Sequence, residues 1–389
     1  MADHKKHHYV PRFYLKFFSE NEKGINLFNI ASQRTVHNGN LKNQCYRNYF
    51  YGKDQVVEDS LALTERAMST VLRSVIQNNA LHVAYRQHKL FILQYIILQH
   101  TRTAYAIDAF DEQTDAFMKH LLSPQIQELN LISEQINGIK ITNTESARLA
   151  LGIAAPHYPL LIDLKCKLLV ATGQHEFITS DNPVVFYNQL MSFQRQRPAT
   201  GFVAKGLQIF FPISPKHLIL LYDGNVYGVG SKQSHVIHIT EHRDIEQLNR
   251  LQFVSALENI YFLNDRYSAI SDYSQAAKFR RTAKINMRVY PQEETVEHRR
   301  EFVFLAKEEI RTNLALSFIR LIKPAKAWLK EFQKMTSQPA VVVRNKQIIR
   351  DFEEFMERVD AQHYGHNDFF TFIHDKYQTT LALDALATD

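Results

Sequence analysis

The stretch Glu176-Phe-Ile-Thr-Ser-Asp-Asn-Pro-Val-Val-Phe186 interrupts an apolar strand pattern with four polar residues and a proline. Thr, Ser, Asp and Asn side chains compete for local backbone hydrogen bonds, and Pro183 has no backbone N–H to donate. The pattern therefore predicts a strand that ends near Asp181. A carboxylate is then left at the mouth of a sheet, where we expect a functional site.

Two hairpins are predicted around this strand end. The first joins residues 167–171 to 177–180 through a Gly173-Gln174 turn, and the second joins 207–211 to 217–222 through a proline-bounded corner. A strand over 25–30 precedes them, and residues 260–263 are expected to form an edge or closing strand. Together these segments predict a small antiparallel sheet.

Helical periodicity dominates the rest of the chain. Helices are predicted over about 54–77, from 83 past 105, over 144–151 and over 240–257. The predicted fold class is therefore α+β, mostly helical, with a small antiparallel sheet of hairpins. A body over residues 1–290 is expected to be followed by a helical C-terminal extension over 291–389.

Composition limits the class of protein. The 389 residues are 45% hydrophobic, which allows a sizeable core, and the net charge of +6 is mild for this length. With only Cys45 and Cys166, neither a disulfide framework nor a cysteine zinc cage is available, which favours a reducing compartment. No signal peptide is apparent, and the most apolar run, Leu90 to Leu98, is far shorter than the roughly 20 residues that span a bilayer.

Two glutamates lie on the apolar stripe of the helix over 54–77. Glu58 and Glu65 share a face about 10 Å apart along the helix axis. If buried, each requires a cation, a metal or a proton. On the next helix Tyr95 and Leu98 belong to a stripe that Arg102 continues, so Arg102 is a candidate counter-ion for Glu58 or Glu65. The alternative is that these charged side chains face water.

Several motifs occur in an order that resembles a known family. They are His8 to Leu15 (HYVPRFYL), the acidic helix around Glu58 to Glu65, Gln99 to Thr103 (QHTRT), Phe177 to Val184 (FITSDNPV), Phe211 to Pro215 (FPISP), and Leu248-Asn249 before Tyr261. In this order they resemble the bacterial family of unknown function DUF 4238, over roughly residues 7–263. The resemblance implies a prokaryotic, cytoplasmic protein and brings no established activity, substrate or catalytic residues.

The candidate site consists of residues suited to metal and phosphate chemistry. They are His8, Glu58, Glu65, Arg102, Asp181 and Asn182, with Lys216 or Asn249 as further members. Glu58, Glu65 and Asp181 are the expected ligands of Mg²⁺ or Mn²⁺, because these ions prefer oxygen ligands. Such an ion generates a hydroxide nucleophile, while Arg102 or Lys216 would hold a phosphate.

Two functions remain open. The first is a metal-dependent phosphodiester hydrolase, nuclease-like, acting on nucleic acid. The second is a non-enzymatic interaction protein in which the same residues form a structural polar network. The expected nucleic-acid contacts are basic residues near the end of the body: Lys278, Arg280, Arg281, Lys284 and Arg288.

Other reaction classes are disfavoured. The chain has no glycine-rich phosphate loop and no Gly-x-Ser-x-Gly motif, which argues against common nucleotide-dependent enzymes and α/β-hydrolases. His238-Ile-Thr-Glu-His242 matches an inverted zinc-protease motif in letters. That chemistry needs both histidines on one helix, whereas Thr240 is a predicted helix N-cap and would leave His238 on the preceding strand.

Overall fold

The computed structural model describes residues 5–122, 138–193, 199–264, 312–335 and 342–377, together with the backbone of 285–292 and 300–307. Within these residues the helices are α1 (Arg12–Lys16), α2 (Val56–Asn78), α3 (Leu81–Thr101), α4 (Ala104–Leu121), α7 (Ser146–Ala154), α8 (His242–Ser255), α10 (Lys323–Lys334), α11 (Lys346–Asp360) and α12 (Phe369–Tyr377), with 3₁₀ segments η1 (Leu41–Asn43) and η2 (Ala155–Leu161). None of the described helices combines the length and hydropathy needed to cross a membrane.

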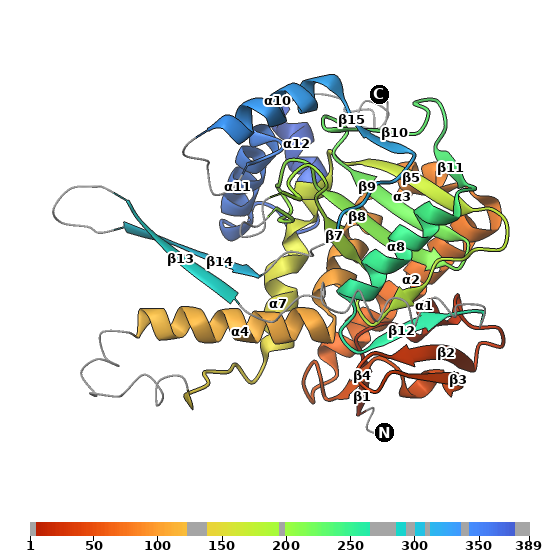
Figure 1. The fold of residues 1–389 in the computed structure, drawn as a ribbon. Coiled ribbons are helices and arrows are strands. Elements are labelled where there is room, and N and C mark those ends of the chain that lie inside the picture. The colour runs from red at the N-terminus through yellow and green to blue at the C-terminus, as the bar shows by residue number, and fades with distance from the viewer. Residues whose placement is uncertain are drawn as a thin grey trace.

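A five-stranded mixed sheet forms the centre of the molecule (Figure 1). Its strand order is β11 (Val236–Ile239), β5 (Lys165–Ala171), β9 (His217–Tyr222), β8 (Gln208–Ser214) and β7 (Val185–Tyr187). β11 runs parallel to β5, and the other neighbours are antiparallel. β8 and β9 are buried along their whole length, as expected where helices cover both faces of a sheet.

Alternate side chains of β5 enter different hydrophobic clusters. Leu168 and Val170 pack with residues of α2 and α3, whereas Leu169 and Ala171 pack with residues of α8. This follows from the two-residue period of a strand, which points successive side chains to opposite faces. In Figure 1, α8 accordingly lies in front of the sheet and α3 behind it.

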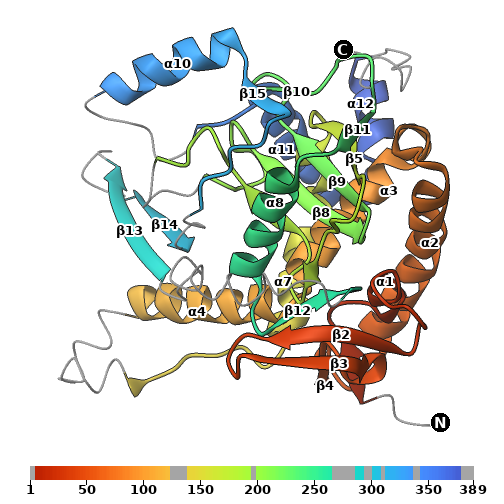
Figure 2. The ribbon, with the colours of Figure 1, turned by 45° about the vertical axis from the view of Figure 1, so that its right-hand side comes forward.

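A second, antiparallel sheet lies at the bottom of Figure 2, and two of its strands come from the N-terminal part of the chain. Its order is β3 (Arg34–Asn40), β2 (Gly24–Asn29), β12 (Asn259–Phe262) and β6 (Thr179–Ser180). Three two-stranded pairings complete the described strands: β1 (Lys6–His8) with β4 (Tyr46–Asn48), β10 (Tyr227–Val229) with β15 (Ile319–Leu321), and β13 (Ile285–Gln292) with β14 (Arg300–Lys307).

The predicted fold class, with one small antiparallel sheet of hairpins, is wrong. The hairpin expected between residues 167–171 and 177–180 does not form, because β5 pairs with β9 and β11 while β6 pairs with β12. The polar residues and Pro183 leave β6 only two residues, too few to match seven-residue β5. β12, expected to be an edge or closing strand, lies between β2 and β6. The C-terminal region, expected to be helical, also contains β14 and β15. The predicted hairpin of β8 with β9 is present.

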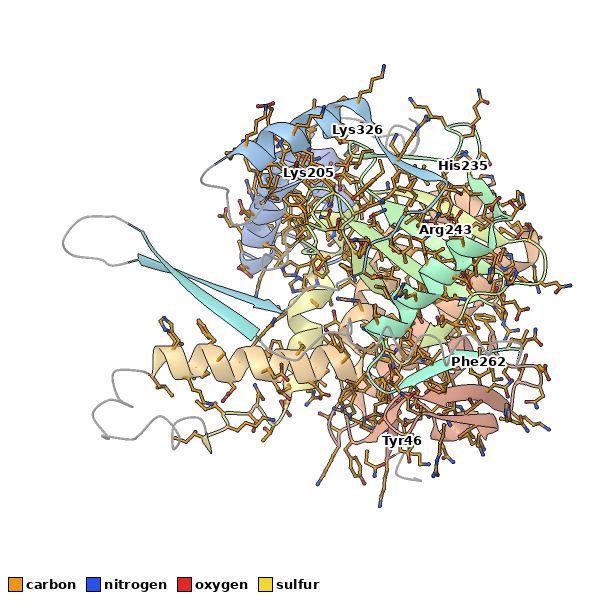
Figure 3. The ribbon with its side chains drawn as sticks, viewed as in Figure 1. Tyr46, Lys205, His235, Arg243, Phe262 and Lys326 are labelled. Carbon is orange, nitrogen blue, oxygen red and sulfur yellow. The ribbon has the colours of Figure 1, made fainter. Side chains whose placement is uncertain are left out.

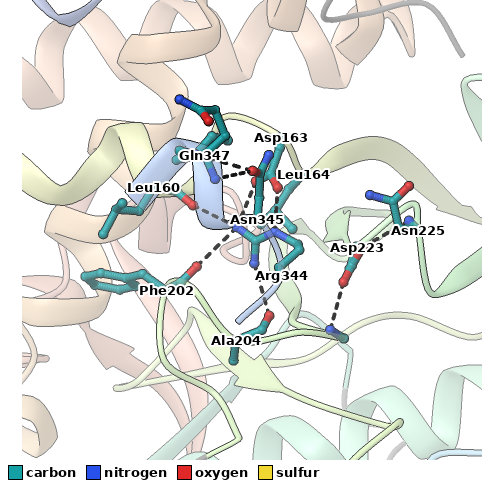
Figure 4. Close-up of polar contacts among 12 residues, drawn as sticks. Leu160, Asp163, Leu164, Phe202, Ala204, Asp223, Asn225, Arg344, Asn345 and Gln347 are labelled. Atoms are coloured by element: carbon teal, nitrogen blue, oxygen red, sulfur yellow. Dashed lines mark hydrogen bonds and ion pairs between the residues drawn. The ribbon is translucent and has the colours of Figure 1, made fainter. Parts of the chain in front are cut away.

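Arg344 fastens the C-terminal segment to the body of the protein (Figure 4). Its Nε and Nη2 donate to the two carboxylate oxygens of Asp163, each at 2.8 Å. Further guanidinium N–H groups donate to the carbonyl oxygens of Leu160, Phe202 and Ala204. The Arg344 side chain is 2% exposed, so these contacts replace the water that the charge loses on burial.

The first prediction concerns this contact. Arg344→Met should lower the free energy of unfolding by about 3–5 kcal/mol, because Asp163 loses its counter-ion in a mostly buried place. Arg358→Met should cost less than about 1 kcal/mol, since both side chains of its pair with Glu354 are exposed. Urea denaturation of the two variants measures the difference, and equal small losses would contradict a fastening role for Arg344.

Candidate functional site

Arg102, directly after α3, is the centre of a buried polar network. Its Nη1 donates to Glu65 Oε1 at 2.8 Å, and its Nη2 donates to the carbonyl oxygen of His8 at 2.7 Å. Its Nε donates to the Tyr51 hydroxyl at 3.2 Å, and the guanidinium lies 5.8 Å from the centre of the Tyr51 ring. Arg102, expected from the helical stripes to be a counter-ion for Glu58 or Glu65, therefore pairs with Glu65, and this ion pair joins α2 to α3.

Glu58 lies on the same face of α2 and is not paired in this way. Its Oε2 is buried and has no hydrogen-bond partner in the described part of the chain. Burial raises the pKa of Glu58 from 4.5 to about 7, with the Arg102 charge opposing this shift and the Glu65 charge adding to it. Glu58 therefore exchanges a proton near neutral pH, as groups in functional sites often do.

His7 and His8 contribute differently. The His8 ring lies with Nδ1 2.9 Å from the carbonyl oxygen of Gln44, and burial lowers the pKa of His8 to about 4, so the ring is neutral at pH 7. His8 thus offers Arg102 its backbone oxygen rather than its ring. His7 is fully buried, stacks on Tyr51 with ring centres 5.8 Å apart, and accepts the Tyr51 backbone N–H at Nδ1.

Asp181 is buried and caps backbone groups. Its Oδ1 accepts the N–H of Leu257 at 2.8 Å, and its Oδ2 accepts those of Glu258 and Asn259 at 2.7 and 2.9 Å. Burial raises the pKa of Asp181 to about 6, although the three hydrogen bonds act in the opposite direction. The polar strand end predicted from the sequence therefore connects β6 to the start of β12.

Asn182 links this strand end to the Arg102 region. Its Oδ1 accepts a hydrogen bond from the hydroxyl of Thr103 at 3.4 Å, and its Nδ2 donates to the carbonyl oxygen of Ser255 at 2.9 Å. Thr103 also caps α4 by accepting the N–H of Ala106. Thr103, the residue after Arg102, is thus one direct contact between the two polar networks.

The two further candidates also contact backbone. Asn249 accepts the N–H of Ile178 at 3.0 Å and donates to the carbonyl oxygen of Glu176 at 2.9 Å, so it fixes the residues before β6 against α8. Lys216 donates to the carbonyl oxygen of Gly173 at 2.9 Å and lies 3.5 Å from the Glu176 carboxylate. Both side chains therefore hold the loop that precedes β6.

The structure brings some predicted residues together and separates others. Glu65, Arg102 and the backbone of His8 meet, and Glu58 lies within electrostatic range of them. Asp181 makes its hydrogen bonds elsewhere, to residues 257–259. Across the described residues, no group of three or more His, Cys, Asp or Glu side chains is arranged to hold a metal ion.

The structure describes the motif that matches an inverted zinc protease in full, and the basic residues expected to contact nucleic acid only in part. His238 lies in β11 and His242 begins α8, so the two histidines do not share a helix, as expected. Of the basic residues expected to contact nucleic acid, Lys278, Arg280, Arg281 and Lys284 lie outside the described residues, and only the backbone of Arg288 is described.

Three side chains of the Arg102 region were not among the predicted site residues: Tyr51, Tyr95 and Gln99. Tyr51 contacts the guanidinium, and Tyr95 and Gln99 precede Arg102 by seven and three residues on the same helix face. The Tyr95 hydroxyl and Gln99 Oε1 are buried, with no hydrogen-bond partner among the residues described. The seven-residue spacing between Tyr95 and Arg102 was the signal in the sequence that could have pointed to Tyr95 as a site residue. The same spacing is equally typical of an aromatic residue in an apolar core stripe.

The second prediction tests the ion pair. Glu65→Leu should cost about 3–5 kcal/mol of unfolding free energy, because it leaves a fully buried guanidinium without its counter-ion. Adding Arg102→Met should recover part of that loss, so the double variant should cost less than the sum of the single ones. A coupling energy below about 1 kcal/mol in urea denaturation would show that the Arg102–Glu65 pair stabilises the fold no more than an exposed ion pair does.

The third prediction concerns Asp181. Asp181→Asn should cost about 2–4 kcal/mol, because an amide nitrogen replaces one acceptor oxygen and faces a backbone N–H. Asp360→Asn, at an exposed position of α11, is the control and should cost almost nothing. If thermal and urea unfolding of Asp181→Asn match those of the control, the carboxylate is not needed as a cap.

The chain matches the family model described as "Protein of unknown function (DUF4238)" over residues 6–266. No significant match was found among curated proteins or among solved structures. The family match covers more than half of the 389 residues and includes both polar networks. The chain therefore belongs to the DUF4238 family of proteins of unknown function.

Proposed function

We propose that this protein is a metal-dependent hydrolase of phosphodiester bonds in nucleic acid, with Glu58 and Glu65 at the reaction centre. The observation that supports the proposal is Glu58 Oε2, a buried oxygen with no hydrogen-bond partner in the described residues. A buried carboxylate oxygen is costly unless it meets a proton or a cation. Glu65 adds a second carboxylate to the same face of α2.

The donor set suits a small, hard cation. Mg²⁺ is commonly held by one or two carboxylates, with water and substrate phosphate filling the remaining positions. Glu58 and Glu65 supply these carboxylates without Asp181, whose oxygens accept backbone N–H groups. When bound, Mg²⁺ or Mn²⁺ would lower the pKa of a coordinated water and so supply the hydroxide for hydrolysis.

Arg102 has a positioning role in this proposal. Its side chain is fully buried, and its three nitrogens donate to Glu65, the His8 backbone and Tyr51. A group engaged in this way orients Glu65 rather than contacting a phosphate. Tyr95 and Gln99, which each present a buried atom lacking a hydrogen-bond partner in the described residues, are candidates for further contacts.

A second function, a non-enzymatic interaction protein, is favoured by a different observation. Arg102 and Asp181 are both engaged by groups of the protein itself, as in a network that fixes a fold. In that case Glu58 is a half-buried acid that carries a proton below about pH 7. The two functions differ in their response to divalent cations.

The fourth prediction measures that response. Mn²⁺ should raise the melting temperature of the wild type, more at pH 8 than at pH 5.5, because a carboxylate must lose its proton to bind metal. Glu58→Gln should abolish the rise and the hydrolysis of a labelled oligonucleotide. Asp59→Asn, an exposed neighbour on α2, should keep both. An equal Mn²⁺ effect on wild type and Glu58→Gln would contradict the proposal.

Without metal, Glu58 also makes stability depend on pH. Its folded pKa is raised from 4.5 to about 7, so between these values the folded chain binds the proton more tightly than the unfolded chain. The contribution of Glu58 to stability is therefore fully present below about pH 4.5 and is lost as pH rises through 7. Glu58→Gln should stabilise the metal-free protein at pH 8 by roughly 1–2 kcal/mol, a value reduced for partial exposure of the side chain.

A further inference from the structure

We propose that α10 is a docking surface for the phosphate backbone of nucleic acid. Its sequence KPAKAWLKEFQK places Lys323, Lys326, Lys330 and Lys334 at spacings of three, four and four residues, and all four are exposed. At 100° per residue they fall within an arc of about 80°, and they extend over about 16 Å of the helix axis. They therefore form a straight row on one face, which we call the lysine row.

The opposite face of α10 packs against the protein and fixes the direction of the lysine row. Ala325 and Phe332 are buried in the cluster that covers the α8 side of the central sheet. Trp328 stacks on Phe332 with ring centres 4.7 Å apart, and Lys205 Nζ lies 5.4 Å from the Trp328 ring centre. Figure 1 shows α10 at the outer edge of the molecule, and Figure 3 shows Lys326 on this helix with Lys205 beneath it.

The charge of the lysine row is mostly uncompensated. In the described part of the chain only Lys334 has an acidic partner, Glu331 at 2.9 Å, and both side chains are more than 70% exposed. The helix thus carries four lysines and one glutamate, a net charge of +3. Arg320, exposed on β15, adds a further positive charge just before the helix.

The geometry favours nucleic acid over a lipid surface. A basic helix that binds membranes inserts its apolar face among the lipids, and here Ala325 and Phe332 are already buried in the protein. The lysine row therefore offers electrostatic contacts without an exposed apolar face. Because these contacts lie along a line, they match the phosphates of a nucleic-acid strand. This inference does not rest on the Glu58 reaction centre, because such binding needs neither a metal nor hydrolysis.

The fifth prediction is a salt titration. Fluorescence anisotropy of a labelled DNA duplex, in EDTA, measures the association constant. The logarithm of this constant should fall linearly with the logarithm of the KCl concentration. Each neutralised phosphate contributes a slope of about −0.9, so four lysines predict a slope between about −3 and −4. Lys326→Gln with Lys330→Gln should reduce the slope by about 2 and weaken binding at ~0.1 M salt by roughly 10–100-fold.

A matched control removes the same charge elsewhere. Lys23 directly precedes β2 and Lys42 lies in η1, and both are exposed. Lys23→Gln with Lys42→Gln should leave slope and affinity unchanged. Equal effects of the two double variants, or no binding of the duplex at low salt, would overturn the proposal. Binding of wild type to vesicles of anionic phospholipid, but not to the duplex, would overturn it in favour of a membrane.

Discussion

The guanidinium of Arg102 is fully buried, and the structure around it is arranged to meet its hydrogen-bonding requirements. Burying a charge costs several kcal/mol unless hydrogen bonds and an opposite charge replace the lost water. Here the replacements come from three separate segments: Glu65 of α2, the backbone of His8 and the hydroxyl of Tyr51. Any displacement of one segment leaves a buried donor unpaired, so this one side chain holds the N-terminal segment, α2 and α3 in a single arrangement.

Asp181 is also buried, and backbone N–H groups satisfy its carboxylate oxygens. Its two oxygens accept three N–H groups at the junction of α8 and β12, which ties the short strand β6 to the second sheet. The hydroxyl of Thr103, next to Arg102, donates to Asn182, next to Asp181. The residues that follow the two buried charges are therefore in direct contact, and this contact is one link between the helical layer and the second sheet.

This distribution separates groups that hold the fold from groups that remain available for chemistry. Arg102 and Asp181 have protein partners, whereas Glu58 Oε2, the Tyr95 hydroxyl and Gln99 Oε1 are buried without hydrogen-bond partners among the described residues. The pKa of Glu58, raised to about 7 chiefly by burial, follows from the same lack of compensation. The proposed reaction centre and the lysine row of α10 also lie on different elements, so reaction and docking can be tested separately.

The sequence by itself determined the elements with strong local signals. It predicted the helices that became α2 and α8, the hairpin of β8 with β9, the strand end at Asp181, and Arg102 as a counter-ion for Glu58 or Glu65, of which the structure selects Glu65. It also predicted a helix from 83 past 105, which the structure divides into α3 and α4. Each of these depends on periodicity, on proline and polar side chains, or on neighbouring helices joined by a short turn. Such features are encoded within a few tens of residues.

Only the tertiary structure decided which strands are neighbours and which polar groups remain without partners. β6 pairs with β12, some 80 residues later, and β5 lies parallel to β11, so the expected hairpin and single small sheet were wrong. The candidate site was divided in the same way, because Asp181 meets the backbone of residues 257–259 and not Glu58 or Glu65. The physical reason is that periodicity specifies which face of an element is apolar, while its partner is selected by packing and hydrogen bonding over the whole chain.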